Sequence, residues 1–146
     1  MEIKIIKYGD ELWNSVIDYA SNCSWRAGAS LARKMKERRF TDWESVLIAT
    51  EGEQFCGYCT LTKTDCIPEV EYTPYIGYMF VDEKYRGHRL SENLINKALE
   101  YAKTLEFEKV YLVSGEKGLY EKYGFVKIEE DKSYCRDDEH IFEICI

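Results

Sequence analysis

A short basic stretch suggests where this chain could do chemistry. The run EKYRGHRLSENLI, residues 83–95, places several cationic or titratable side chains around Gly87: Lys84, Arg86, His88 and Arg89. It lies between an apolar, strand-like run, YIGYMFV, and a helix-like run, LSENLINKALEYAK. A helix N-terminus offers about four unpaired N–H groups and roughly half a positive charge, and a glycine lets backbone approach a ligand closely. The stretch therefore predicts an anion-binding turn.

This turn differs from the common phosphate-binding loops. A P-loop needs GxxxxGK[ST] and a dinucleotide-binding turn needs GxGxxG, whereas residues 83–95 contain one glycine. A second candidate segment, GLYEKYGF at residues 118–125, follows the short apolar run KVYLVS and carries Tyr120.

Together the two segments resemble the GNAT superfamily of acyl-CoA-dependent N-acetyltransferases. In FVDEKYRGHRLS, Arg86 matches the first position of the family's [Q/R]-x-x-G-x-[G/A] turn. In LYEKYGF, three residues match the second motif: Tyr120, Gly124 and Phe125. Arg89 stands where the family usually has its middle glycine, and Ser91 where it has glycine or alanine. We expect Arg89 to keep a negative φ and to contribute its N–H group.

The resemblance implies a binding site for acetyl-CoA as co-substrate. The main chain at Phe80 and Val81 would pair with the pantetheine arm. Successive N–H groups would hold the pyrophosphate, and the resemblance places them at Arg86, Gly87, His88, Arg89, Leu90 and Ser91.

The resemblance also implies catalytic roles. Tyr120 would protonate the leaving thiolate, and the N–H of Val81 would polarise the thioester carbonyl. Glu71 is the candidate general base, with a solvated loop carboxylate as the alternative interpretation. For Tyr123 we expect core packing. Alternating aromatics before and within residues 75–81 predict core positions, with a substrate cleft as the alternative.

The implied reaction transfers an acetyl group from acetyl-CoA to a primary amine of a small molecule or peptide, by direct attack on the thioester. Two alternatives stay open: a non-catalytic acyl-CoA-binding sensor domain, and an acylase of proteins or aminoacyl-tRNA. The acceptor's charge also stays open. Acidic residues 65–83 would attract a cationic amine, basic residues 26–39 would attract a carboxylate-bearing one, and either run can be a solvated face.

Length and composition narrow the classes of protein to which this chain could belong. The length of 146 residues predicts a single N-acetyltransferase-like domain over residues 1–146. No apolar run approaches the roughly 20 residues of a membrane span, and charges interrupt the apolar start, so we expect a cytoplasmic protein without a membrane partner. A net charge of −7 argues against an extended nucleic-acid surface.

The six cysteines are expected to be reduced, because the chain shows no export signal. Cys56 and Cys59 have redox-motif spacing, but they lie in a strand-like run, where residues three apart point to opposite faces. Two histidines supply too few further ligands for a zinc site, and we expect no metal.

The pattern of periodicities predicts a mixed α/β fold. Strands are expected at residues 2–7, 45–64 (a hairpin), 75–81, 109–114, 125–130 and 140–146, and helices at 10–23 (capped by Asp10), 25–40, 90–105 and 117–124. One β-α-β crossover joins residues 75–81 to 109–114, and the other pairs are hairpins, so the sheet should be mostly antiparallel with helices on both faces. The apolar final strand could extend a sheet across a homodimer, or its edge could be covered.

Overall fold

The computed structural model describes residues 1–64, 72–128 and 139–146. Its elements follow the predicted order. They are β1 (Glu2–Ile6), α1 (Trp13–Asn22), α2 (Gly28–Lys36), β2 (Ser45–Glu51), β3 (Gln54–Thr62), β4 (Tyr75–Val81), a short 3-10 helix η1 (Glu83–Tyr85), α3 (Leu90–Thr104), β5 (Lys109–Ser114), α4 (Leu119–Lys122), β6 (Val126–Ile128) and β7 (His140–Cys145).

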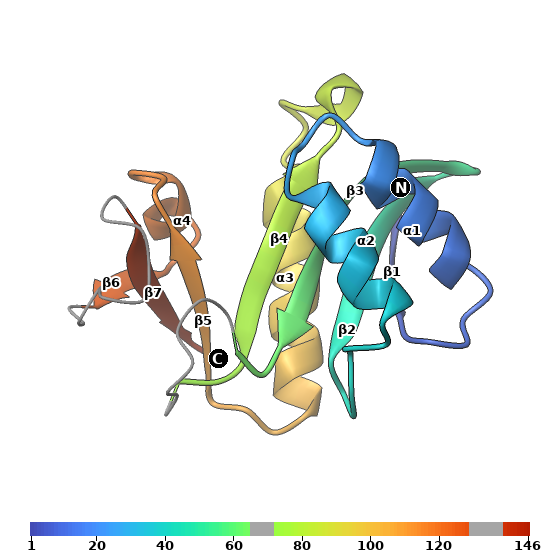
Figure 1. The fold of residues 1–146 in the computed structure, drawn as a ribbon. Helices are drawn as coiled ribbons and strands as arrows, with labels where there is room; N and C mark the ends of the chain where they lie inside the picture. Colours follow the sequence, from blue (N-terminus) through green and yellow to red (C-terminus); the bar gives the residue numbers. More distant parts are fainter. Residues whose placement is uncertain (65–71, 129–138) are drawn as a thin grey trace.

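The strands form one seven-stranded sheet in the order β1-β2-β3-β4-β5-β7-β6. Neighbouring strands run antiparallel except β4 and β5, which are parallel and joined through α3. The predicted mixed, mostly antiparallel sheet with one β-α-β crossover is confirmed (Figure 1).

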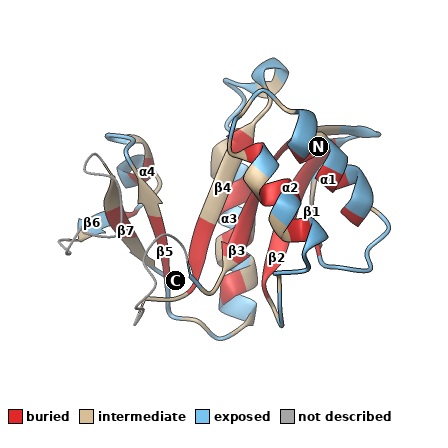
Figure 2. Cartoon of the chain, in the orientation of Figure 1, coloured by how far each residue is buried: buried red, intermediate tan, exposed pale blue. Residues whose placement is uncertain are grey.

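Helices cover both faces of this sheet, as expected. α1 and α2 pack on one face over a core that includes Val16, Leu31 and Tyr58, while α3 packs on the other over a core that includes Leu61 and Leu94. The buried residues concentrate where the helices meet the central strands (Figure 2). The faces follow from periodicity, since apolar residues recur every three or four positions in the helices and every second position in the strands.

The helices are shorter than predicted, and the structure shows the reason at two of their boundaries. α1 begins at Trp13, and the Asp10 carboxylate accepts the N–H of Leu12 at 2.9 Å, so Asp10 organises the turn before the helix rather than capping it. α2 ends at Lys36, because Arg38 takes a left-handed φ of 56° that no α-helix continues through.

Cys56 and Cys59 do not lie on opposite sides of the sheet, which corrects the prediction. Both belong to the core cluster under α3. The β2–β3 register shifts between Ala49 and Thr50, and such a bulge changes which face the following residues of β3 occupy. Both side chains are buried free thiols, so the expectation of core residues without a disulfide holds for this pair.

The final strand is not an edge of the sheet. β7 pairs with β5 along its length and with β6 over Ile141, Phe142 and Glu143. The covered edge considered from sequence is therefore present over these three residues.

Gly28 gives a test of how closely α1 and α2 pack. A Cβ on Gly28 would contact the Ala20 carbonyl and lie 2.7 Å from Cys23 Sγ. A glycine-to-alanine change ordinarily favours a helix, yet here we expect Gly28→Ala to lower the free energy of unfolding by about 2 kcal/mol. Urea denaturation measures this change in the free energy of unfolding. Ala29→Gly, one residue along and exposed, should show the ordinary loss of about 1 kcal/mol. A Gly28→Ala protein more stable than wild type would contradict this packing.

Candidate active site

The sheet opens between β4 and β5. Their parallel pairing is limited to Tyr75 with Tyr111 and Ile76 with Leu112. Beyond that point β5 stays paired with β7 up to Ser114, while β4 stays with β3 up to Val81. The two strands start side by side and diverge toward their carboxyl ends (Figure 1). Backbone groups on the facing edges of both strands therefore lack a strand partner.

A bulge in β4 accompanies this opening. Thr60 pairs with Gly77 and Tyr58 with Phe80, so two residues of β4, Tyr78 and Met79, lie opposite one residue of β3. Tyr78 has a φ of 49°, a conformation that bulky residues rarely adopt. Tyr78 then packs with the core under α1 and α2 and Met79 with the core under α3.

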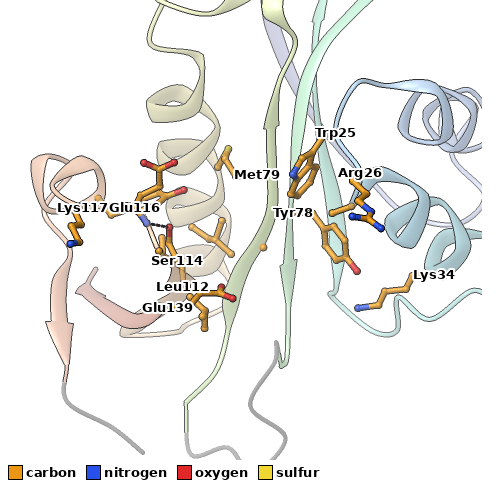
Figure 3. A pocket seen from close by; sticks show the side chains of 16 residues that line it. Trp25, Arg26, Lys34, Tyr78, Met79, Leu112, Ser114, Glu116, Lys117 and Glu139 are labelled. Carbon is orange, nitrogen blue, oxygen red and sulfur yellow. Dashed lines mark hydrogen bonds between the residues drawn. The ribbon is translucent and has the colours of Figure 1, made fainter. Parts of the chain in front are cut away.

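A cavity of about 950 Å³ occupies the opening. Figure 3 shows its two walls. One wall comes from β5 and the segments near it, with Leu112, Ser114, Glu116, Lys117 and Glu139; the other lies beside α2, with Trp25, Arg26, Lys34 and Tyr78. Ile76, Gly77 and Met79 of β4 lie between them. The walls thus carry three cations and two carboxylates.

Tyr120 is the predicted catalytic residue that lines this cavity. It lies on α4, 7% exposed, with its ring against Tyr123, Phe125 and Phe142 at centroid distances of 6.0 to 6.2 Å. Burial, followed by the charge of Glu116, raises the pKa of Tyr120 to about 12 from its ordinary value of 10.0. The phenol is therefore a proton donor that stays protonated at neutral pH.

The predicted anion-binding turn has the open amides that such a site needs. α3 begins at Leu90 without a side-chain cap, and its first helical hydrogen bond runs from the Asn93 N–H to the Arg89 carbonyl at 3.0 Å. A Cβ on Gly87 would meet no atom within 4 Å. The N–H groups that precede Asn93 at this helix start are consequently available to a ligand.

Phe80 and Val81 contribute differently to the opening. The Asp82 N–H donates to the Cys56 carbonyl at 2.8 Å, next to the paired residues Val81 and Gly57. Because hydrogen-bonded pairs alternate along an antiparallel ladder, the peptide groups of Val81 point away from β3, whereas those of Phe80 point toward it. The Val81 carbonyl accepts the Arg86 Nε–H at 3.2 Å, which ties the basic turn to the end of β4. Phe80 is buried among aromatic rings, stacked on Trp25 at 6.2 Å.

Comparison with known proteins identifies this arrangement. Residues 13–125 match the family model described as the acetyltransferase (GNAT) family. The chain belongs to the GNAT acetyltransferase family. A comparison with curated proteins returned no match.

Solved structures share the fold of this GNAT protein. An acetyltransferase from Streptococcus agalactiae is 22% identical, with 99% of this chain and 98% of that chain covered and a TM-score of 0.64. A GNAT family N-acetyltransferase (YhbS) from Escherichia coli, crystallised in complex with CoA, is 22% identical, with 99% and 80% covered and a TM-score of 0.73. An aminoglycoside 6'-acetyltransferase type Ii is 15% identical, with 99% and 97% covered and a TM-score of 0.74.

Arg89 departs from the sequence prediction. Its φ is 60° and its ψ 27°, in the left-handed region, where a negative φ was expected. Glycine would adopt this conformation without a Cβ penalty, and arginine occupies it at a cost of about 1 kcal/mol. The Arg89 side chain is exposed and lies 3.9 Å from Glu92.

Other predicted residues have mixed outcomes. Glu71 lies outside the described residues. Lys84, Arg86 and His88 are exposed, with their side chains outside the large cavity. Ser91 Oγ lies 3.1 Å from the Tyr123 hydroxyl, which joins the start of α3 to the end of α4. Tyr123 also packs on the core, as expected.

Sequence reasoning missed the two carboxylates of the cavity wall. Glu139 precedes β7, and the pairing of His140 with Ser114 brings it beside the end of β5. The sequence showed only an acidic run before a strand, and nothing local indicated which strand β7 would join. Glu116 follows β5 directly, a position that is a signal in open sheets, where ligands bind beyond strand carboxyl ends.

No described helix is long and apolar enough to cross a membrane. The described histidine, cysteine and acidic side chains form no group that could hold a metal ion.

The conformation of Arg89 yields a stability test. We expect Arg89→Gly to unfold within about 0.5 kcal/mol of wild type, because relief of the left-handed strain offsets the greater chain entropy of glycine. Arg89→Val should lose about 1–2 kcal/mol, since a β-branched residue fits this conformation poorly. Urea unfolding at neutral pH compares them. Equal losses in both variants would contradict the left-handed turn.

Proposed function

We propose that this GNAT acetyltransferase transfers an acetyl group from acetyl-CoA to a primary amine of a small molecule or peptide. The observation that carries the proposal is the separation of β4 from β5, which opens a cavity beside a buried, protonated tyrosine. The similar structure from Escherichia coli was crystallised with CoA, which supports the choice of acyl donor.

The residues present fit a coenzyme at two places. The uncapped amides of residues 87–92 suit a diphosphate, and the exposed Arg86, His88 and Arg89 add charge there. The peptide groups of Val81 suit an extended amide-containing arm that adds to the open edge of β4. These positions, with Phe80, Gly87, Leu90 and Ser91, form the proposed binding site.

Acetyl-CoA supplies the acetyl thioester, and residues of the chain donate and accept the protons. The amine nitrogen forms a bond to the carbonyl carbon as the carbon–sulfur bond breaks. Tyr120 gives its phenolic proton to the departing sulfur, and the Val81 N–H stabilises negative charge on the carbonyl oxygen. The nitrogen is positively charged once its bond to carbon has formed, and the proton it then releases restores the Tyr120 phenol. An alkylamine has a pKa near 10, so it must lose a proton before attack. We propose Glu71 as its acceptor, directly or through water.

The acid role of Tyr120 is tested by Tyr120→Phe. Removing a general acid lowers rates by at least about 100-fold, so we expect kcat to fall by that factor with little change in KM for acetyl-CoA. The raised pKa of about 12 further predicts that wild-type kcat does not fall on the alkaline side up to about pH 10, because the phenol remains protonated.

Steady-state assays of thiol release measure the kcat of Tyr120→Phe and the pH dependence of the wild-type kcat. The control is Tyr101→Phe, which removes a hydroxyl bonded to the Trp43 carbonyl at 2.8 Å, remote from the cavity, and should lower stability without changing kcat. An unchanged kcat in Tyr120→Phe would remove Tyr120 from the mechanism.

Donor binding is tested by thermal unfolding with acetyl-CoA. A ligand that binds only the folded state stabilises it by about 2.7 kcal/mol at 100 times its Kd. We expect acetyl-CoA and free coenzyme A to raise Tm, with the effect reduced at high salt because charged groups hold the diphosphate. No shift at millimolar acetyl-CoA would contradict the proposal. A shift without transfer to any amine of a broad panel would favour the sensor alternative.

A further inference from the structure

A second, smaller cavity adjoins the first on the side of α2. Its volume is about 220 Å³, and it shares Lys34, Gly77 and Tyr78 with the large cavity. The rest of its wall comes from the segment after α2 and from β3. At about 30 Å³ per water in the liquid, its volume matches roughly seven waters. It is therefore sized for part of a small molecule rather than for a polypeptide segment.

A buried hydroxyl without a partner lines this second cavity. Thr60 on β3 is 1% exposed, and its Oγ1 has no hydrogen-bond partner among the residues that the structure describes. Leaving a buried polar group unsatisfied costs about 1–3 kcal/mol, so such groups are uncommon in folded proteins. An oxygen atom of a bound ligand would satisfy Thr60.

Lys34 supplies a cation that is held in place. Its Nζ lies 5.0 Å from the centroid of the Tyr78 ring, and the Tyr78 hydroxyl bonds Ser30 Oγ at 2.8 Å. The bulge of β4 turns Tyr78 to this side of the sheet, as its left-handed φ records. Among the described residues, no carboxylate lies within ion-pair distance of Lys34, which is half-buried.

The other charged groups of the second cavity are already engaged. Arg39 Nε lies 2.8 Å from Glu37. The Glu44 carboxylate accepts the N–H and hydroxyl of Thr41 at 3.1 and 3.0 Å and the N–H of Lys63 at 2.8 Å. Neutral donors satisfy the Glu44 oxygens but leave its charge in the wall, so Lys34 and Arg39 against Glu44 give the lining a net charge of +1. Lys34 is the half-buried one of the two cations, and Arg39 is exposed. One ammonium beside one hydroxyl matches a monoanionic carboxylate better than a doubly charged phosphate.

We propose that the second cavity binds the carboxylate of the acceptor, so that the substrate class is small amines carrying a carboxylate a few bonds from the reacting nitrogen. This inference rests on the proposed function. The carboxylate accepts hydrogen bonds from Lys34 and Thr60, and the amine extends past Gly77 and Tyr78 into the large cavity toward Tyr120. The walls of the large cavity carry three cations, Arg26, Lys34 and Lys117, against two carboxylates, and this balance disfavours polycationic acceptors.

The test measures binding of conjugates that join donor and acceptor. Coenzyme A is linked through sulfur and an acetyl bridge to the nitrogen of glycine, β-alanine or γ-aminobutyrate, and each conjugate has a partner whose carboxylate is a neutral carboxamide. Calorimetry compares the pairs. We expect wild type to bind the best-fitting carboxylate conjugate about tenfold tighter than its carboxamide, the effect of one charge-assisted hydrogen bond.

Three variants separate the loss of a contact with the ligand from a general effect on folding. Lys34→Gln should abolish the preference for carboxylate, and Lys36→Gln, on the same helix with its side chain exposed and outside both cavities, should retain it. Thr60→Val should weaken carboxylate binding several-fold without lowering Tm, because it removes an unsatisfied hydroxyl from a nearly isosteric side chain.

Each outcome of these binding measurements supports or overturns the proposed carboxylate site. Equal affinities for carboxylate and carboxamide at all three lengths, or a preference that survives in Lys34→Gln, would overturn the carboxylate site and leave the proposed function standing. A protein that binds coenzyme A but neither the carboxylate nor the carboxamide conjugate would also overturn the carboxylate site. Failure of coenzyme A itself to bind would defeat the proposed function first.

Discussion

The whole site depends on β4 being bound to β3 while it leaves β5. A sheet strand normally satisfies its peptide groups on both edges, and unpaired groups on a buried edge are costly. Here the parallel pairing stops after Ile76 and Leu112, and the bulge at Tyr78 and Met79 marks the place where β4 departs. The fold tolerates the opening because it lines a cavity in which a ligand can pair with the exposed edge.

The same bulge links the proposed coenzyme site to the proposed acceptor site. It turns Tyr78 toward α2, where the ring lies under Lys34, and Met79 toward α3. α3 in turn begins at the uncapped turn, and Arg86 ties that turn to the Val81 carbonyl. A local change in one strand therefore positions groups on both faces of the sheet. Because the turn is basic in an acidic chain, its charge would act on a bound anion locally rather than through the whole surface.

Periodicity was sufficient to predict the elements, their order and the sheet type, because helices and strands bury faces that recur at 3.6 and 2 residues. The prediction from periodicity failed where an extra residue in a bulge interrupts the alternation of a strand. The bulges in β3 and β4 altered which residues share a face, so the shared environment of Cys56 and Cys59 and the orientation of Tyr78 were not predictable from alternation.

The sequence predicted a turn before the helix that begins at Leu90, and the structure has one there. Sequence could not show that Arg89 adopts a left-handed conformation, since arginine has no intrinsic preference for it. Lys34 was one of six basic residues between positions 26 and 39. Only the packing of α2 on β4 shows that Lys34 lines both cavities, whereas Arg26 and Arg39 each line one. Glu139 was hidden for a related reason, because its place depends on the pairing of β7 with β5.

A crystal structure of the protein with coenzyme A tests the central claim most directly. The account predicts the pantetheine arm between β4 and β5, hydrogen-bonded to the peptide groups of Val81, with the diphosphate on the amides of residues 87–92 and the sulfur near the Tyr120 hydroxyl. A coenzyme bound elsewhere, with β4 and β5 closed against each other beyond Ile76 and Leu112, would contradict it.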